Sequence, residues 1–395
     1  MRSVCVITSS RADFGLLRPL LLRLTGDARL RLSILATGTH LSPEFGLTVS
    51  EIEAAGLRVD ERVECILSAD TPTATATTMG LALTGAAAAL ARLSPDVVVV
   101  LGDRFEIFAC AAAAAVSRIP LAHIHGGEVT TGAYDDGFRH GITKLSHLHF
   151  TAAEPYRRRV IQLGERPETV FNTGALGVDA VLGLPLFSRE ETAERLGLSW
   201  GGRTFLATFH PCTLESIDPA EQVRMLLDAL IALPDTRTIF TKGNADTHGR
   251  RINALLKQAQ LEHPDRIAVY DSLGQQLYFS VMRYADGVVG NSSSGIIEAP
   301  SFKVGVLNIG SRQEGRLRSG NIIDCPCQPE AIAVGLNRLL SPGFRATLPT
   351  VQSPFGDGQA ARRIADVLAD YPLSDLVPKP FFDLPPTLFS RWSPE

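Results

Sequence analysis

Val97-Val98-Val99-Val100-Leu101-Gly102-Asp103-Arg104 combines an apolar run with a glycine, a carboxylate and a guanidinium. A continuous run of β-branched residues is typical of a central parallel strand that is buried on both faces. Open α/β sheets keep their binding sites at the carboxyl ends of such strands. Asp103 and Arg104 are therefore predicted to lie at a ligand-binding edge, where Gly102 lets a ligand approach the backbone closely. The alternative is that Asp103 only caps the following helix.

The same order, an apolar strand followed by a helix, recurs along almost the whole chain. Apolar runs predict strands at Ser3–Thr8, Arg31–Thr37, Val97–Leu101, Ile119–Ile124, His147–Thr151, Thr204–Phe209, Arg237–Thr241, Ile267–Tyr270, Gly287–Val289 and Val304–Ile309. Such alternation implies right-handed crossovers and parallel sheets, the α/β class.

The length of 395 residues exceeds what one ordinary core holds, so we expect two Rossmann-like domains that face each other across a cleft. The expected domains are residues 1–175, with acid–base groups at strand ends, and residues 176–365, with a phosphate-binding turn. Glycines and a proline place the linker near Asn172–Leu184. Residues 366–395 are expected to form a strap, with the first domain as the surface it would pack on.

Composition narrows the class of protein. Apolar residues make up 45% and charged residues 20%, as in an ordinary globular protein. The net charge of −4 and the dispersed basic residues argue against a nucleic-acid binder. The six cysteines lack paired zinc spacing, so reduced thiols and a cytoplasmic location are expected. No signal peptide is expected at the N-terminus. Because charges interrupt the apolar runs short of about 18 residues, no membrane span is expected.

A second informative stretch lies at a later strand-to-helix turn. Residues 290–298 read GNSSSGIIE and follow the apolar strand Gly287–Val289. A helix start with free N–H groups and hydroxyls suits a phosphate, and three consecutive serines exceed what one helix cap needs. Glu298 is placed for ribose hydroxyls. The predicted nucleotide-binding residues here are Asn291, Ser292, Ser293, Ser294, Glu298, Arg312 and Arg316.

Further titratable residues follow the strands of the first half. His125-Gly126-Gly127-Glu128 forms a glycine-rich turn between two titratable groups, although a purely structural turn is the alternative. Asp135 and Arg139 lie at a helix start, where a capped helix with an i,i+4 charge pair is the alternative.

Three other residues are candidates at strand ends. Arg11 is expected at the site edge as a phosphate or sugar ligand, or else as a solvated charge beside a capping Asp13. His40 is a second candidate for substrate binding and His210 a candidate in the later half. Spacing alone favours structural roles for both histidines.

Several common motifs are missing from the sequence. The chain contains no GxxxxGK[ST], GxGxxG or GxSxG, which disfavours the ATP, dinucleotide and hydrolase sites that carry them. His123 and His125, and likewise His147 and His149, form H-x-H pairs on strands. No third ligand with suitable spacing accompanies either pair, so no metal site is expected.

Taken together, these motifs resemble the hydrolysing UDP-N-acetylglucosamine 2-epimerases. The resemblance runs from Val4 to about Ile364. The segments that carry it are Gly102–Glu106, Ile119–Glu128, Asp135–His140, Ile142–His147, Val160–Glu165, Thr208–Pro211 and Asn291–Gly295.

The resemblance implies a GT-B-like fold, with conversion of a nucleotide-sugar and water to the free 2-epimeric sugar and the nucleotide. It implies no cofactor and no metal, a product that feeds sialic or legionaminic acid synthesis, and a homodimer or homotetramer. Related enzymes act on UDP-N-acetylglucosamine, on UDP-2,4-diacetamido-2,4,6-trideoxyglucose or on GDP-linked sugars. UDP-N-acetylglucosamine, giving N-acetylmannosamine, is the first expectation.

The implied chemistry needs acid–base groups and cations. The nucleotide leaves first, loss of the C2 proton gives a glycal, and water adds at C1 while C2 is reprotonated on the other face. Asp103, Glu128 and Asp135 are the expected acid–base cluster, with Arg139 and His210 at the departing diphosphate. Arg11 and Arg104 are expected to face the phosphates.

One position departs from the family pattern. Many relatives carry Glu where this chain has His125, so the group that moves the C2 proton is left open among Asp103, Glu128 and His125. A GT-B glycosyltransferase and a non-catalytic nucleotide-sugar sensor are the other function classes that the sequence allows.

Overall fold

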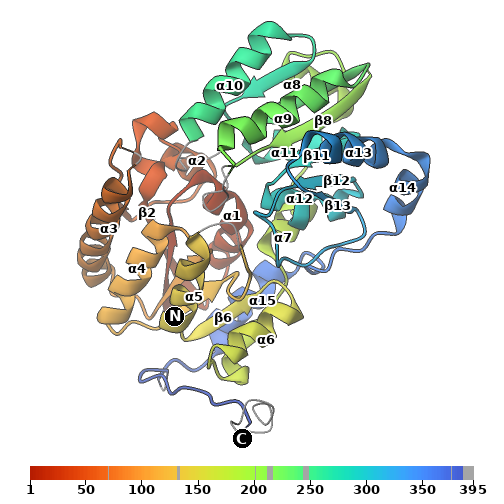
Figure 1. The fold of residues 1–395 in the computed structure, drawn as a ribbon. Coiled ribbons are helices and arrows are strands. Elements are labelled where there is room, and N and C mark those ends of the chain that lie inside the picture. Colours follow the sequence, from red (N-terminus) through yellow and green to blue (C-terminus); the bar gives the residue numbers. More distant parts are fainter. Residues whose placement is uncertain are drawn as a thin grey trace, which may run out of the picture. The chain divides into compact units, whose positions relative to one another are not determined.

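The computed structural model describes residues 1–69, 71–130, 134–200, 202–210, 217–242, 249–374 and 376–385. Contacts divide the chain into two compact units (Figure 1). The first unit comprises Met1–Glu128, Asp135–Leu176 and the chain from Gln359 onward; the second comprises Val129–Tyr134 and Gly177–Gly358. Each unit contains one parallel sheet, which confirms the predicted fold class of two Rossmann-like α/β domains.

The sheet of the first unit has seven strands in the order β3-β2-β1-β4-β5-β6-β7. The strands are β1 (Arg2–Thr8), β2 (Leu30–Thr37), β3 (Glu61–Val63), β4 (Val97–Leu101), β5 (Leu121–Ile124), β6 (Leu148–Thr151) and β7 (Val170–Asn172). All neighbouring pairs are parallel, and Cys5 of β1 pairs with Val98 of β4. The strand order reverses between β1 and β4, which is where ligands bind in doubly wound sheets.

Helices cover both faces of this sheet because its strands are apolar on both sides. They are α1 (Arg11–Thr25), α2 (Val49–Ala54), α3 (Pro72–Leu93), α4 (Phe105–Val116), α5 (Asp135–Leu145), α6 (Glu154–Gln162) and α15 (Ala360–Asp370). Val97 and Val99 pack in one hydrophobic cluster with residues of α1 and α15. Val98 and Val100 pack in another cluster with residues of α3 and α4. Successive side chains of β4 thus enter two different hydrophobic clusters, which explains why the whole strand is apolar.

Helix α3 corrects one expectation about charge. No charged residue occurs between Pro72 and Ala91, and an 18-residue window of the helix has a mean hydropathy of 1.3. By length and composition this one described helix is apolar enough to cross a membrane, so the expected interruption by charge was wrong here. Ala86, Ala89 and Leu90 are buried against the sheet, and α3 packs beside α4. The helix is thus the crossover between β3 and β4.

The second unit repeats the strand order with six strands, β10-β9-β8-β11-β12-β13. They are β8 (Arg203–Thr208), β9 (Thr236–Thr241), β10 (Ile267–Tyr270), β11 (Gly287–Gly290), β12 (Val306–Ile309) and β13 (Ile322–Cys325). The helices around them are α7 (Leu176–Gly183), α8 (Arg189–Leu196), α9 (Pro219–Ala232), α10 (Gly249–Glu262), α11 (Gly274–Tyr284), α12 (Ser293–Ile297), α13 (Pro329–Leu340) and α14 (Pro342–Thr347). The order reverses between β8 and β11, so the GNSSSG turn lies at the switch point.

Short elements account for most differences from the sequence-based expectation. Strands β3, β7 and β13 have only three or four residues each and were not predicted. Residues Leu176–Gly183, inside the expected linker, form helix α7. Val178, Ala180 and Val181 are buried there, and this packing outweighs the low helix propensity of Gly177 and Gly183 within the helix.

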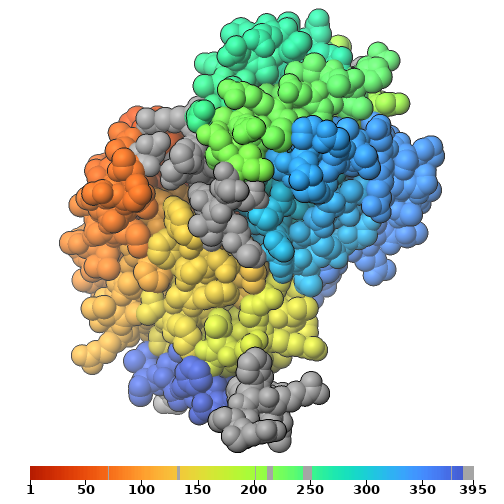
Figure 2. Space-filling model, viewed as in Figure 1, coloured from red at the N-terminus to blue at the C-terminus, as the bar shows by residue number. Residues whose placement is uncertain are grey.

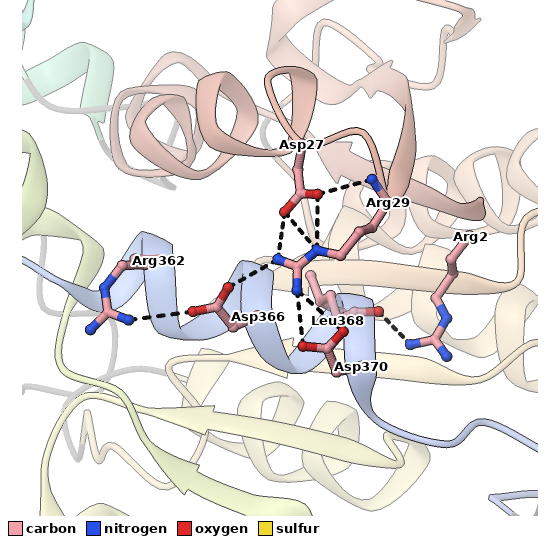
Figure 3. Close-up of polar contacts among 7 residues, drawn as sticks. All are labelled: Arg2, Asp27, Arg29, Arg362, Asp366, Leu368 and Asp370. Atoms are coloured by element: carbon pink, nitrogen blue, oxygen red, sulfur yellow. Dashed lines mark hydrogen bonds and ion pairs between the residues drawn. The ribbon is translucent and has the colours of Figure 1, made fainter.

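Helix α15 belongs to the first unit although it follows the whole second unit in sequence. Its contacts with α1 include Ile364 and Leu368 in the core. Arg29 binds Asp27, Asp366 and Asp370, and Arg2 donates to the Leu368 carbonyl (Figure 3). The side chain of Arg29 is 44% exposed, so solvent screens these ion pairs. The apolar face of α15 is therefore the main reason for its return to this sheet.

Candidate active site

Two backbone turns with positive φ place the candidate groups of the first unit. Gly102 (φ 79°) follows β4, and His125 (φ 67°) follows β5. A left-handed conformation is ordinary for glycine but strained for histidine, and such strain is concentrated at functional sites. The His125 N–H donates to the carbonyl of Phe150 on β6, which fixes the turn. Asp103 and His125 therefore lie at the carboxyl ends of adjacent strands.

Arg139 of α5 links these two turns. Its guanidinium pairs with the Asp103 carboxylate and donates to the His125 carbonyl at 3.1 Å. The Arg139 side chain is only 4% exposed. Burial opposes its charge, but the carboxylates of Asp103, Glu128, Asp136 and Asp135 outweigh that effect and raise the pKa of Arg139. A buried cation surrounded by carboxylates is the central feature of this site.

His125 and Glu128 form a buried pair across the glycine-rich turn. The Nδ1 atom of His125 lies 3.0 Å from the Glu128 carboxylate, and the two side chains are 6% and 1% exposed. The Nε2 atom of His125 has no hydrogen-bond partner within the described part of the chain. An imidazole beside a carboxylate is a pair of groups that can exchange a proton with a substrate.

A second buried histidine supports the Asp103 turn from behind. The Nε2 atom of His123 lies 2.8 Å from the Gly102 carbonyl, and its Nδ1 lies 3.1 Å from the Thr143 hydroxyl on α5. Burial lowers the pKa of His123 to about 3, so the ring is neutral with its proton on Nε2. Within the described ranges no group of three His, Cys, Asp or Glu side chains lies close enough to hold a metal.

Two arginines of the first unit have different surroundings. Arg104 makes two hydrogen bonds, at 2.9 and 3.2 Å, to the carboxylate of Glu106, which is fully buried. This pair fixes the guanidinium at the end of β4. Arg11 is the first residue of α1, whose N-cap is Ser10 rather than the expected Asp13. The Asp13 carboxylate instead accepts from the Ser9 N–H and hydroxyl.

His40 has the surroundings of a structural residue. It is fully buried, with Nε2 at 2.9 Å from the Thr8 hydroxyl and Nδ1 at 2.8 Å from the Thr48 hydroxyl. Burial lowers the pKa of His40 to about 4. Both ring nitrogens are engaged within the unit, which favours the structural alternative over substrate binding.

Asn291 organises the switch point of the second unit. Its side-chain oxygen accepts from the His210 N–H at 2.7 Å, and its amide donates to the His210 carbonyl at 2.8 Å. Arg312 and Gln313 donate to the Asn291 carbonyl at 3.3 and 2.8 Å. The ends of β8 and β11 and the loop after β12 are thereby held together.

The three serines of the GNSSSG turn have different positions. Ser292 is the N-cap of α12 and accepts from the Ser294 N–H at 3.3 Å, while Ser293 begins the helix. Ser294 interacts with the hydroxyl of Tyr278, whose pKa burial raises to about 12. Ser294 therefore contacts a neighbouring side chain, whereas Ser292 and Ser293 lie at the start of α12.

Glycine is required at positions 290 and 177 because atoms of neighbouring residues lie very close to the backbone there. A Cβ atom at Gly290 would lie 2.1 Å from the Thr208 carbonyl oxygen of β8. A Cβ atom at Gly177 of α7 would lie 2.3 Å from a carboxylate oxygen of Glu298, which is 5% exposed. Glu298 therefore lies against α7. Further along, Arg316 donates to the Thr130 hydroxyl at 3.4 Å.

The predicted site residues thus form a separate group in each unit. Asp103, Glu128, Asp135, Arg139 and His125 are grouped at the sheet edge of the first unit. His210, Asn291 and Arg312 are grouped in the second unit. Sequence reasoning missed the supporting roles of Glu106, His123, Thr143, Tyr278 and Gln313. The H-x-H pattern had singled out His123, but only as a metal ligand, which the spacing of the pairs did not favour.

Two α/β units with polar groups at both switch points match a known family. The UDP-N-acetylglucosamine 2-epimerase profile matches residues 22–369. The chain is 41% identical to the GDP/UDP-N,N'-diacetylbacillosamine 2-epimerase (hydrolyzing) of Campylobacter jejuni, over 82% of this chain and 84% of the relative. It is 36% identical to polysialic acid biosynthesis protein P7 of Escherichia coli, over 98% of each chain. It is 35% identical to the Legionella pneumophila UDP-N,N'-diacetylbacillosamine 2-epimerase (hydrolyzing), over 94% and 97%. The chain belongs to the UDP-N-acetylglucosamine 2-epimerase family.

Solved structures support the fold assignment. The Neisseria meningitidis UDP-GlcNAc 2-epimerase bound to UDP-GlcNAc superposes with a TM-score of 0.80 at 17% identity, over 93% of this chain and 99% of the other. The Methanocaldococcus jannaschii UDP-GlcNAc 2-epimerase, in complex with UDP-GlcNAc and UDP, gives 0.78 at 20% identity, over 93% and 99%. The fold is the GT-B-like fold of these epimerases, as the sequence resemblance implied.

Proposed function

We propose that this chain is a hydrolysing 2-epimerase that converts a UDP-linked 2-acetamido sugar and water to UDP and the free 2-epimeric sugar. The observation that carries the proposal is the buried Arg139 guanidinium among the carboxylates of Asp103, Glu128 and Asp135. Family membership and two relatives named as hydrolysing 2-epimerases support the reaction type.

The reaction needs a proton to leave one face of the sugar and return to the other. The C1–O bond breaks first and UDP departs with the bonding electrons, which leaves positive charge at C1. A base then takes the C2 proton and a glycal forms. Water adds at C1, and an acid returns a proton to C2 from the opposite face. Asp103 is the carboxylate proposed to face the cationic C1. The His125–Glu128 pair is proposed to take the C2 proton, and Asp135, the third expected acid–base group, is proposed to return a proton from the opposite face.

Arg139 is proposed to keep the carboxylates of this cluster ionised and oriented rather than to bind the departing diphosphate. Its guanidinium is held by Asp103 and by the His125 carbonyl and is almost fully buried. The diphosphate is assigned to Ser292, Ser293 and Arg312 of the second unit, with His210 beside them and Glu298 at the ribose. The bonds from Arg312 and His210 to Asn291 support this assignment.

The names of two relatives bear on which sugar the substrate carries. The relatives at 41% and 35% identity are both named for N,N'-diacetylbacillosamine, the 2,4-diacetamido-2,4,6-trideoxy sugar. We therefore propose the UDP-linked diacetamido sugar as the first candidate substrate and UDP-N-acetylglucosamine as the second. A GDP-linked form is included because the first relative is named for both nucleotides.

Incubating the protein separately with the UDP-linked diacetamido sugar, its GDP form and UDP-N-acetylglucosamine should identify the substrate. Proton NMR is expected to record free 2-epimeric sugar and nucleotide without any acceptor, fastest with the UDP-diacetamido sugar. Fastest turnover of UDP-N-acetylglucosamine would reverse the order of the two sugars. Product only when an acceptor alcohol is added would indicate a glycosyltransferase instead.

The Ser293→Ala substitution should weaken UDP binding by about 1–2 kcal/mol, which corresponds to about 5–30-fold in Kd. The expected cause is loss of a hydrogen bond from the hydroxyl to a charged phosphate oxygen at the start of α12. Calorimetric titration of UDP measures the change. Ser341→Ala, which removes the N-cap serine of α14 in the same unit, is the matched control and should leave the Kd unchanged. An unaltered Kd for both Ser292→Ala and Ser293→Ala would exclude this phosphate site.

A further inference from the structure

The described residues after α15, 371–374 and 376–385, contact the first unit. This segment lies beyond the residues that the family profile matches, which end at 369. In Figure 2 the last coloured residues, in dark blue, lie against the surface of that unit. Lys379 donates three hydrogen bonds there, to the carbonyls of Lys144 (2.7 Å) and Ser146 (2.6 Å) and to the carboxylate of Glu165 (2.7 Å). An ammonium group has three donors, so all of them are used.

Glu165 is the buried centre of these contacts. Its side chain is 2% exposed and accepts from Lys144 at 2.6 Å and from His149 at 3.0 Å as well as from Lys379. Burial raises the pKa of this carboxyl, but the hydrogen bonds from His149 and the two lysines outweigh it and lower the pKa to about 2. Glu165 therefore stays charged at neutral pH, and removing Lys379 would leave part of a buried charge unpaired.

Two phenylalanines beside Lys379 fix the register of the segment. The Phe382 N–H donates to the Gly164 carbonyl at 2.9 Å. The Phe381 ring covers Gly164 so closely that a Cβ atom there would lie 2.3 Å from it. The Lys144 ammonium lies 4.7 Å from the centre of the same ring, within cation–π range. The segment is thus seated by specific contacts rather than by a general apolar surface.

We propose that Lys379 is a positioning residue for the epimerase reaction, acting through helix α5. Its two carbonyl partners, on Lys144 and Ser146, lie at the C-terminal end of α5, where unpaired carbonyls attract a cation. The same helix carries Arg139, which holds Asp103 and the His125 carbonyl, and Thr143, which holds His123. The proposal rests on the proposed function, because it assigns Lys379 to the orientation of that site.

Helix α5 is so short that a displacement of its C-terminal end would reach Arg139. Asp135–Leu145 makes only about three turns, and Arg139 lies little more than one turn before Lys144. A shift of the C-terminal end would therefore move the Arg139 guanidinium and both groups it holds. Small displacements of catalytic groups cost turnover far more than they cost binding.

Lys379→Met in the full-length chain tests the proposal. We expect kcat to fall about 10- to 100-fold while the Kd for UDP, measured calorimetrically, stays within about twofold of the parent. Hydrogen–deuterium exchange should increase in peptides covering residues 139–146. In Lys379→Ala, added propylammonium should restore part of kcat by refilling the ammonium site, whereas propanol should not.

Arg29→Ala is the matched control because Arg29 also ties the C-terminal part of the chain to this unit, but through Asp366 and Asp370 of α15 (Figure 3). It should leave kcat unchanged. A folded Lys379→Met with kcat within twofold of the parent would overturn the proposal, even if its melting temperature fell. If Lys379→Met does not fold, Lys379→Gln, which keeps an amide donor, replaces it under the same criteria. A parent enzyme without product would contradict the proposed function instead.

Discussion

The Asp103→Asn substitution is expected to lower turnover about 10²–10⁴-fold, the usual contribution of a group that acts directly on the reacting atoms. The amide keeps the size of the side chain and can still accept from Arg139, but it lacks the charge that would stabilise a cationic C1. UDP affinity should change little, because the proposed phosphate ligands belong to the second unit. Release of UDP from the nucleotide-sugar measures turnover, and calorimetry measures the Kd.

Asp96→Asn is the matched control for this substitution. Asp96 precedes β4 and accepts from the Ser3 N–H at 2.7 Å, so it lies at the opposite end of the strand that Asp103 follows. Its replacement should leave turnover within about twofold, since it lies away from the site edge. Asp103→Asn with turnover within a few-fold of the parent would remove Asp103 from the mechanism.

Glu128→Gln is expected to cause a loss of similar size, about 10²–10⁴-fold in kcat. A glutamine side chain keeps the shape of the group beside His125, but an amide cannot take up or give back a carboxyl proton. Steady-state kinetics measure the loss.

Combining Glu128→Gln with His125→Gln tests whether the two residues act as a unit. Their contact at 3.0 Å predicts that the double variant loses little more than the more damaging single variant. Losses that multiply would instead mean that the two side chains act independently. If the Glu128→Gln variant kept nearly the turnover of the parent, transfer of the C2 proton would be assigned to Asp135 or to His125 alone.

Much of the fold could be predicted because strand signals were local. The run Val97–Leu101 is strand β4 with the predicted bounds, since apolar β-branched residues fit a strand buried on both faces. Helix α7 was not predicted, because its stability comes from burial of Val178 and Val181 and not from its glycine-containing sequence. The return of the last helix to the first unit was only a guess from the sequence, because it depends on contacts of α15 with residues more than 300 positions earlier.

The sequence was enough to predict which residue types form the candidate site, but not which of these residues contact one another. Asp103 and Glu128 follow strands, and position along the chain is enough to place them at the sheet edge. The role of Arg139 as the link between two turns depends on the packing of α5, which no local pattern encodes. His40 shows the converse, because its spacing already favoured a structural role, and its ring nitrogens lie against the hydroxyls of Thr8 and Thr48.

Reaction in D₂O tests the central claim most directly. If the chain removes the C2 proton and returns one from solvent, the free sugar should carry one deuterium at C2 and the epimeric configuration there. Proton NMR of the sugar and mass spectrometry of both products measure this. An epimerised sugar released with hydrogen retained at C2 would contradict elimination, and a sugar released without inversion would contradict 2-epimerisation itself.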